Sequence, residues 1–223
     1  MKDPLSREAI VAEALRQLTA DGIKGMSLRK VAAALETGPA SLYAYVDDLD
    51  ALNALVLDRA LHEVDTRGSA KASWRDRLLR ILESYTEVLS ESPGLAQLAF
   101  GTVAIGPNAL RITEALLALL AEGGVDVPTA AWAVDLLVLY VTAVVAEHSG
   151  GTHPAAPEGT VARAILGVSE GQYPRIHAAR AHMLSGTPRE RFGWALEVLL
   201  GGILRRRRKA KTRRSPRSRK RAG

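Results

Sequence analysis

A serine followed by histidines forms the first pattern in this sequence that could do chemistry. Gly167-Val168-Ser169-Glu170-Gly171 has the spacing G-x-S-x-G, and His177 and His182 follow it. In α/β-hydrolases this spacing presents a nucleophilic serine on a turn between a buried strand and a helix. Here the surrounding sequence is helical and Tyr173-Pro174 interrupts it, so we expect a loop between helices. The sequence therefore predicts that the protein is not an enzyme.

Metal binding is the second chemistry to consider. The chain has five histidines, at His62, His148, His153, His177 and His182. Two pairs are spaced i, i+5, which does not bring both imidazoles onto one helical face as i, i+4 would. The chain has no cysteine, so a thiolate metal site, a disulfide and a cysteine nucleophile are all impossible. We expect no metal and no cofactor.

The stretch from Met26 to Val46 has the pattern of two short helices separated by a break. Ser27 is a natural N-cap, and apolar residues then recur at helical spacing until Glu36-Thr37-Gly38. Pro39 suits the first position of a second helix, whose inward face would carry Leu42 and Val46. Two helices joined by a short turn are typical of a helix-turn-helix that places its second helix in the DNA major groove.

The outward residues of this motif are the candidate DNA contacts. Tyr43 and Tyr45 lie two positions apart and cannot share a face, so at least one hydroxyl is available for a phosphate. Arg29 is either a base or phosphate contact or a solvated charge, and the alanines either touch thymine methyl groups or only avoid a steric conflict. The alternative is a three-helix bundle that does not bind DNA. The predicted contacts are Ser27, Arg29, Pro39, Ala40, Ser41, Tyr43, Ala44 and Tyr45.

These residues and several later ones resemble the TetR (tetracycline repressor) family of bacterial transcriptional regulators. The first half of the resemblance consists of Gly22, Ser27-x-Arg29-x-Val31-Ala32, Leu42-Tyr43-x-Tyr45-Val46 and Leu49-x-x-Leu52. The second half, similar to the tetracycline repressor subgroup, consists of Ser73-Trp74, Gly101-Thr102, Tyr173-Pro174-x-Ile176-His177 and Phe192-Gly193-x-Ala195-Leu196-Glu197-Val198-Leu199. The resemblance implies a homodimeric transcriptional repressor that binds DNA and is released from it by a small-molecule ligand.

The sequence departs from the family pattern at four positions. Glu36 stands where the family has a turn glycine, Tyr45 where it has a histidine, and Leu49 where it has a basic residue. Glu147 is where the resemblance places a carboxylate near a tetracycline–metal complex, but Ala99 replaces the accompanying histidine. We therefore expect an organic effector without a metal.

The predicted fold class is all-α, with an N-terminal three-helix DNA-binding domain and a C-terminal helical bundle for ligand binding and dimerisation. The chain has 223 residues, 47% of them hydrophobic, which is enough for a substantial core. We expect a DNA-binding domain over 1–48, a helical domain over 49–204 and a disordered tail over 205–223. Apolar periodicity predicts helices over 6–20, 49–66, 74–90, 95–101, 108–122, 129–148 and 187–203, and the segment 149–159 is expected to be a mobile loop.

The net charge of +6 has an uneven distribution. Twelve of the 30 Lys and Arg residues lie in 205–223, which has no acidic residue, so the first 204 residues carry 18 basic and 24 acidic residues. A block of like charge without apolar residues does not fold. It could add sequence-independent attraction to phosphate. A low-specificity DNA-coating protein that acts through this tail is therefore the alternative function.

Polar and aromatic side chains interrupt the apolar faces of the C-terminal half. Such a mixture suits a mostly apolar effector pocket with a few orienting hydrogen bonds, although the same residues could simply complete a core. The predicted ligand-binding residues are Tyr85, Gln97, Thr102, Trp132, Tyr140, Glu147 and His177, with Thr142 and His148 also among the interspersed polar groups.

The predicted partners are a palindromic DNA operator, a small-molecule effector and a second copy of the chain. One short recognition helix contacts few base pairs, so two copies about 34 Å apart are needed. The helices over 129–148 and 187–203 are the candidate dimer interface, with Leu136, Val144, Phe192, Leu196 and Leu199 on their apolar surfaces. No signal peptide is recognisable, and the apolar run 136–146 is about half a membrane span. We expect a buried helix there, no membrane partner and a cytoplasmic protein.

Overall fold

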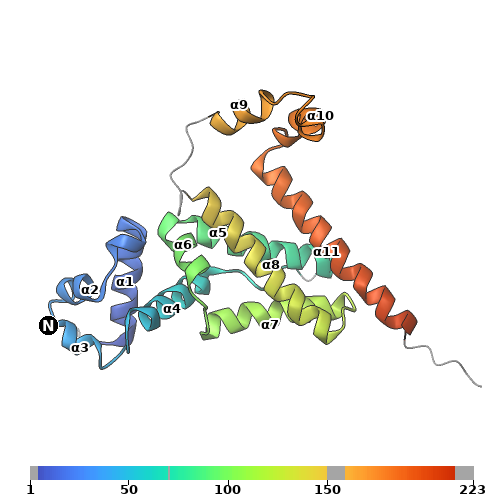
Figure 1. The fold of residues 1–223 in the computed structure, drawn as a ribbon. Helices are drawn as coiled ribbons and strands as arrows, with labels where there is room; N and C mark the ends of the chain where they lie inside the picture. The colour runs from blue at the N-terminus through green and yellow to red at the C-terminus, as the bar shows by residue number, and fades with distance from the viewer. Residues whose placement is uncertain (1–4, 70, 150–158, 214–223) are drawn as a thin grey trace, which may run out of the picture. The chain divides into compact units, whose positions relative to one another are not determined.

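The computed structural model describes residues 5–69, 71–149 and 159–213, where every regular element is a helix (Figure 1). The predicted all-α class is confirmed. The chain divides into two compact units, one of Met1–Gly151 with Ile203–Gly223 and one of Thr152–Gly202. The separate prediction of a functional boundary at residue 48 remains a prediction.

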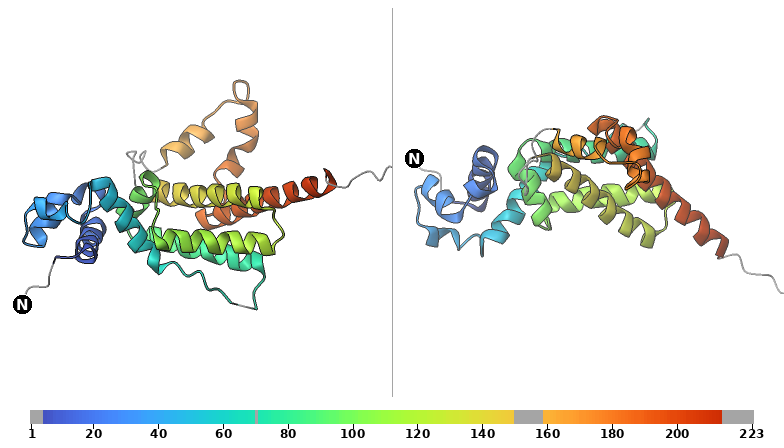
Figure 2. Two further views of the ribbon diagram at one scale, coloured as in Figure 1. Left: turned by 90° about the horizontal axis from the view of Figure 1, so that it is seen from below. Right: turned by 45° about the horizontal axis from the view of Figure 1, so that its top comes forward.

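The first unit contains a small three-helix group, a connecting helix and a four-helix bundle. The group is α1 (Arg7–Asp21), α2 (Leu28–Ala34) and α3 (Pro39–Leu42), with a 3₁₀ turn η1 (Ile23–Gly25). The connecting helix is α4 (Leu49–Ala60), which continues into a second 3₁₀ turn η2 (Leu61–Glu63). The bundle is α5 (Trp74–Ser90), α6 (Pro93–Gly101), α7 (Pro107–Glu122) and α8 (Val127–His148). Both views of Figure 2 show α4 leading from the three-helix group to the bundle.

Side-chain caps fix the starts of most helices in this unit. The side chains of Ser6, Ser27, Asp48, Ser73, Ser92 and Asp126 each accept a backbone N–H of the helix that follows. Such a cap satisfies one of the four N–H groups that a helix start leaves without a partner. These starts are therefore encoded locally in the sequence.

The three-helix group has its own apolar core. Four of its residues have no exposed surface: Ile10 and Leu18 of α1, Val31 of α2 and Leu42 of α3. Val46, four residues after Leu42, is buried as well. The group joins the bundle closely, because α1 packs on α6 as well as on α4. A Cβ atom at Gly94 in α6 would lie 2.8 Å from the carbonyl oxygen of Leu18. A movement of α6 would therefore displace α1 directly.

Helix α8 is the most apolar element of the bundle. Among the described residues it is the one helix whose length and composition would allow it to cross a membrane. One of its faces packs against α5, α6 and α7, with Leu137 and Val141 fully buried. The opposite face exposes Trp132, Leu136 and Leu139, so the expectation of a buried helix holds for one side only.

The second unit holds α9 (Thr160–Leu166), α10 (Pro174–Met183) and the first part of α11 (Pro188–Arg213). Helices α9 and α10 contact each other but bury none of their residues. Thr187 and Glu190 form a reciprocal capping box at the start of α11: the Glu190 carboxylate accepts the Thr187 N–H, and the Thr187 hydroxyl oxygen accepts the Glu190 N–H.

Several predicted boundaries are wrong in detail. Helix α3 ends at Leu42, and residues 43–45 form a turn in which the Leu42 carbonyl accepts the N–H groups of both Tyr45 and Val46. Helix α4 ends at Ala60, not near residue 66, because a 3₁₀ turn follows. Helix α11 extends into the predicted disordered tail as far as Arg213, since adding a residue to an existing helix costs less than starting one. The expected loop between helices around Ser169 is present as the turn between α9 and α10, although no bounds were predicted for these two helices. The expected mobile loop lies largely outside the described residues.

Candidate DNA-binding surface and ligand cavity

The starts of α2 and α3 form one exposed surface of the three-helix group. Ser27 caps α2 by accepting the Lys30 N–H at 3.3 Å, and Arg29 in its first turn is exposed. Pro39, Ala40 and Ser41 of α3 are exposed as well, while Leu42 on the opposite side is fully buried. The small residues at the start of α3 would let its backbone approach a groove floor closely.

The turn between α2 and α3 is a Schellman motif. The Glu36 N–H donates to the Ala33 carbonyl at 3.0 Å, and the Thr37 N–H donates to the Ala32 carbonyl at 2.9 Å. Glu36 has φ +50°, the left-handed conformation that glycine adopts most easily. Gly38 has an ordinary φ of −79°, so it does not take over the role of the missing turn glycine.

Tyr45 ties the end of this motif to the beginning of α1. Its hydroxyl donates to the Leu5 carbonyl at 2.8 Å, and its own carbonyl accepts a hydrogen bond from Arg7 Nε at 3.1 Å. Tyr43 is 55% exposed. Of the two tyrosines, Tyr43 therefore has the more accessible ring and Tyr45 has a structural role.

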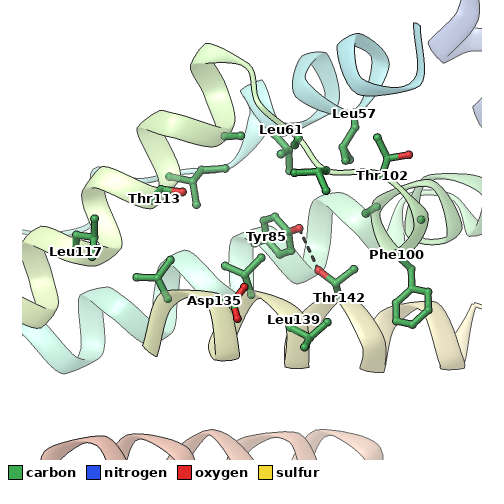
Figure 3. A pocket seen from close by; sticks show the side chains of 18 of the residues that line it. Leu57, Leu61, Tyr85, Phe100, Thr102, Thr113, Leu117, Asp135, Leu139 and Thr142 are labelled. Atoms are coloured by element: carbon green, nitrogen blue, oxygen red, sulfur yellow. Dashed lines mark hydrogen bonds between the residues drawn. The ribbon is translucent and has the colours of Figure 1, made fainter. Parts of the chain in front are cut away.

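A cavity of about 610 Å³ lies within the bundle (Figure 3). Its walls come from α4 with η2, from α5, from the end of α6 and the loop after it, and from α7 and α8. Most of the lining is apolar, including Leu57, Leu61, Ile112, Leu117, Val134, Val138 and Leu139. Volume and lining are those of a site for a small organic molecule.

Two hydroxyl groups form a buried pair in the wall of this cavity. The Tyr85 hydroxyl and Thr142 Oγ1 lie 3.1 Å apart, joined by the dashed line in Figure 3. Burial raises the pKa of Tyr85, and the hydrogen bond with Thr142 offsets part of this shift. A tyrosine is already neutral at physiological pH, and the raised pKa keeps this phenol neutral at higher pH as well. Thr102 and Thr113 supply further hydroxyls on other sides of the cavity.

Asp58 connects α4 to the start of α7. Its carboxylate is buried and accepts the backbone N–H groups of Asn108 and Ala109 at 3.1 and 3.0 Å, together with the Asn108 side-chain amide at 3.0 Å. The residue that precedes α7 is Gly106, where a Cβ atom would lie 2.0 Å from Asp58 Cγ. A side chain of α4 thus caps α7, and the glycine leaves the space for it.

Arg111 of α7 makes the reverse connection. Its guanidinium donates to the carbonyl oxygens of Leu61, His62 and Val64, at 2.9 to 3.2 Å, and to the Thr66 hydroxyl at 2.8 Å. These carbonyls belong to η2 and the residue after it, so a cation satisfies acceptors that the helix end leaves free. Helices α4 and α7 therefore hold each other at both connections, directly beside the cavity.

Comparison with known proteins identifies the family. Residues 68–207, well over half of the chain, match the family model described as "Tetracyclin repressor-like, C-terminal domain". An HTH-type transcriptional regulator of Saccharopolyspora erythraea is 32% identical over 182 residues, covering 78% of this chain and 75% of that protein. The chain belongs to the TetR family of transcriptional regulators.

Two further TetR-family relatives cover most of the chain. The HTH-type transcriptional repressor DrrR1 of Streptomyces coeruleorubidus is 26% identical over 212 residues, which is 91% of this chain and 78% of that protein. The crystal structure of apo ActR from Streptomyces coelicolor is 30% identical, with a TM-score of 0.85 over 94% of this chain and all of that one. ActR has also been crystallised with actinorhodin, and that structure superposes with a TM-score of 0.82 over 91% of this chain and 98% of that one.

The structure brings the predicted DNA contacts of this TetR protein together on the three-helix group. Arg29, Pro39, Ala40, Ser41, Tyr43 and Ala44 are exposed, whereas Ser27 and Tyr45 are half-buried and engaged in hydrogen bonds. Tyr43, Ala44 and Tyr45 also line a smaller cavity of about 410 Å³, which they share with Leu55 of α4 and Ile105. Part of their surface therefore faces α4.

The predicted ligand residues are dispersed. Tyr85 and Thr102 line the cavity, as does Thr142. Gln97, Tyr140 and Glu147 do not line it, and Trp132 is 76% exposed on the outer face of α8. His177 belongs to α10 in the second unit.

The other two candidate chemistries find no support in the described residues. Ser169 lies in the turn between α9 and α10, without the preceding strand that a nucleophile elbow requires, and its hydroxyl oxygen accepts the Gln172 N–H at 3.3 Å. Within the described part of the chain no three His, Asp or Glu side chains gather as metal ligands. His153 lies outside that part.

Sequence reasoning missed Asp58, Arg111 and Asp135. Asp58 interrupts an apolar stripe that includes Val56, Leu57 and Ala60, and a carboxylate on a buried face needs partners. That signal was available. Nothing in the sequence indicated that Arg111 would cap η2 or that Asp135 would line the cavity.

Proposed function

We propose that this TetR-family regulator is a repressor that binds a palindromic operator as a homodimer and is released by a small molecule bound in the 610 Å³ cavity. The observation that carries the proposal is that the cavity shares its walls with the helices that hold the DNA-binding group. Leu57 and Leu61 line it from α4 and η2, and Ala99 and Thr102 line it from α6 and the residue after it.

Operator contact would come from the exposed starts of α2 and α3 and from Tyr43, which follows α3. Arg29 and Tyr43 offer a cation and a phenol for phosphate or base edges, and Ala40 and Ser41 offer small side chains at the groove floor. The charge of this region is nearly balanced, with six basic and five acidic residues in 1–46. Affinity from a single copy would therefore be weak, which favours binding as a dimer.

The outer face of α8 supports dimerisation. Trp132, Leu136 and Leu139 are 42 to 76% exposed and lie one turn apart on one face of this helix. Monomeric proteins rarely leave such a continuous apolar face in water. In the second unit, Trp194 and Val198 of α11 are 70% and 47% exposed and offer further apolar surface.

Release would follow from the contacts between α4, α6 and α7. A ligand that separates α7 from α4 strains the Asp58 and Arg111 connections, and one that displaces α6 shifts α1 through the close approach at Gly94. The ligand must bind the DNA-incompetent state better, and tenfold weaker operator binding needs about 1.4 kcal/mol of coupling. ActR in complex with actinorhodin supports a small-molecule effector for this chain.

Selection of bound duplexes from a random library tests the DNA half of the proposal. We expect an inverted repeat with half-sites about one helical turn, or roughly 34 Å, apart, and a dimer by sedimentation equilibrium. Arg29→Ala and Tyr43→Ala should each weaken binding to the selected duplex at least about tenfold with unchanged circular dichroism. Arg16→Ala on α1 and Tyr173→Ala before α10 are matched controls, because each removes the same side chain elsewhere on the surface.

The proposal would be contradicted if the protein were a monomer at micromolar concentration, or if the selected duplexes shared no sequence pattern. The second outcome would instead favour the DNA-coating function of the basic residues in 205–223. Deleting these residues should lower the slope of log affinity against log salt by about 0.9 for each phosphate that they neutralise, and sequence preference should survive. If the deletion abolished all DNA binding, the tail would be the part of the protein that binds DNA.

A further inference from the structure

The cavity between α4 and α8 has one charged residue in its lining. Of its nineteen lining residues, Asp135 is the one acidic residue, and none is Lys, Arg or His. The remaining polar side chains are the hydroxyls of Tyr85, Thr102, Thr113 and Thr142. A bound molecule therefore meets a negative charge and no positive one.

Asp135 is available for a ligand. It lies on α8, one turn before Leu139 and two turns before Thr142, and Figure 3 shows it in the cavity wall below Tyr85. Among the described residues no side chain or backbone N–H forms a hydrogen bond or ion pair with its carboxylate. By contrast Asp58, beside the same cavity, has its oxygens occupied by the start of α7.

The other polar side chains of the lining are hydroxyls and carry no positive charge. The Tyr85 hydroxyl and Thr142 Oγ1 share a hydrogen bond, and burial raises the pKa of Tyr85 further above neutral pH. No group in the lining could neutralise a ligand carboxylate or phosphate, whereas an ammonium would gain a charge-assisted hydrogen bond to Asp135. The apolar walls select the rest of the molecule by burial.

We infer that the effector is a largely apolar molecule with one amine, whose ammonium group pairs with Asp135. This inference rests on the proposed function of the cavity as the effector site and names the class of ligand that the site prefers. Asp135 is exposed to solvent, so it stays hydrated until a ligand arrives and its attraction is partly screened. We therefore expect a preference of about tenfold for the amine over a neutral analogue, or about 1.4 kcal/mol.

Three probes with the same ring system test the inference: aminomethylanthracene, hydroxymethylanthracene and anthracenecarboxylate. Isothermal titration calorimetry on the full chain should rank them amine, alcohol, carboxylate, with the amine about tenfold tighter than the alcohol. Asp135→Asn should bring the amine and the alcohol to equal affinity and leave the alcohol unchanged. Glu147→Gln is the matched control, because it removes one carboxylate from the same helix outside the cavity lining and should preserve the preference.

Four results would overturn the inference: equal binding of amine and alcohol to the wild type, an amine preference that survives in Asp135→Asn, its loss in Glu147→Gln, or no binding of any probe. Sedimentation of Asp135→Asn must show an unchanged association state, since a change would assign the carboxylate to an interface between subunits and contradict the inference.

Operator binding measured with the same probes separates this inference from the proposed function. If the amine binds through Asp135 without weakening operator binding, the ligand class stands and the release mechanism fails. If the alcohol binds as tightly as the amine and releases DNA, the release mechanism stands and the ligand class fails.

Discussion

The three-helix DNA-binding group and the α5–α8 bundle differ in how completely they are filled. In the group, apolar residues from all three helices meet without exposed surface, as at Ile10, Val31 and Leu42. The bundle leaves about 610 Å³ open among helices that also bury fully enclosed residues, such as Leu116 and Leu137. A filled core holds the proposed DNA-contacting side chains in one arrangement, whereas a hollow one can change its arrangement when a ligand supplies the missing contacts.

Truncating one leucine in each region should give the largest contrast. Leu42→Ala empties a fully enclosed position and should lower the free energy of unfolding by about 3 to 5 kcal/mol, with loss of operator binding. Leu117→Ala removes the same atoms from the wall of the existing cavity, where Leu117 is only half-buried, and should cost about 1 to 2 kcal/mol. Urea unfolding of both variants measures the difference. Equal losses would show that the bundle is as tightly packed as the DNA-binding group.

Asp58→Ala breaks the connection between the two regions. It leaves the N–H groups of Asn108 and Ala109 without their buried acceptor, so we expect a loss of about 2 to 3 kcal/mol. Asp50→Ala, at an exposed position in the first turn of α4, should cost under about 1 kcal/mol. The Asp58 variant should also respond to effector with a smaller change in operator affinity. An effector response equal to that of the wild type would exclude Asp58 from the coupling.

Tyr85→Phe tests the polar wall of the cavity. At neutral pH the loss of the hydrogen bond to Thr142 should cost about 1 kcal/mol. Because burial raises the pKa of Tyr85, the folded protein keeps this proton above about pH 10, where an unfolded tyrosine loses it. Fewer protons are then bound in the unfolded state, so the stability of the wild type falls as pH rises, and the gap between wild type and variant should shrink. Unfolding curves at pH 7 to 11 would show a constant gap if Tyr85 were solvated.

Glu36→Gly should have the smallest effect, and it should be stabilising. Glycine adopts the left-handed conformation of residue 36 without the steric cost that a Cβ atom brings, although it adds entropy to the unfolded chain. The expected net gain is about 0.5 to 1 kcal/mol by urea unfolding. Gly38→Ala, at an ordinary φ, is the comparison and should not destabilise. A loss on Glu36→Gly would mean that the Glu36 side chain contributes more than the backbone strain costs.

Most helices could be predicted from the sequence because their determinants are local. The bounds of α5 agree with the prediction at both ends, since Ser73 caps it and its apolar face stops at Ser90. Helix α3 was predicted too long because Leu42 and Val46 fit a helical spacing that a turn also satisfies. Helices α9 and α10 bury no residue, so no core-facing stripe marks where they begin and end.

The DNA-binding surface and the cavity also differ in how far the sequence predicts them. The proposed DNA-binding residues lie in one segment of about twenty residues, so their positions relative to one another follow from helix geometry. The cavity takes residues from five helices, and nothing local says which faces converge. On α8 almost every position is apolar, so its sequence does not reveal that Trp132 points outward while Thr142 and Asp135 line the cavity.

Operator affinity measured with and without a cavity ligand tests the coupling most directly. In Thr113→Trp the indole would block the cavity. A compound that raises the melting temperature of the wild type but not of this variant therefore binds in the cavity. Fluorescence anisotropy with the selected duplex should then show at least tenfold weaker binding by the wild type when the compound saturates it, and no change for Thr113→Trp. Unchanged affinity of the occupied wild type would contradict the account.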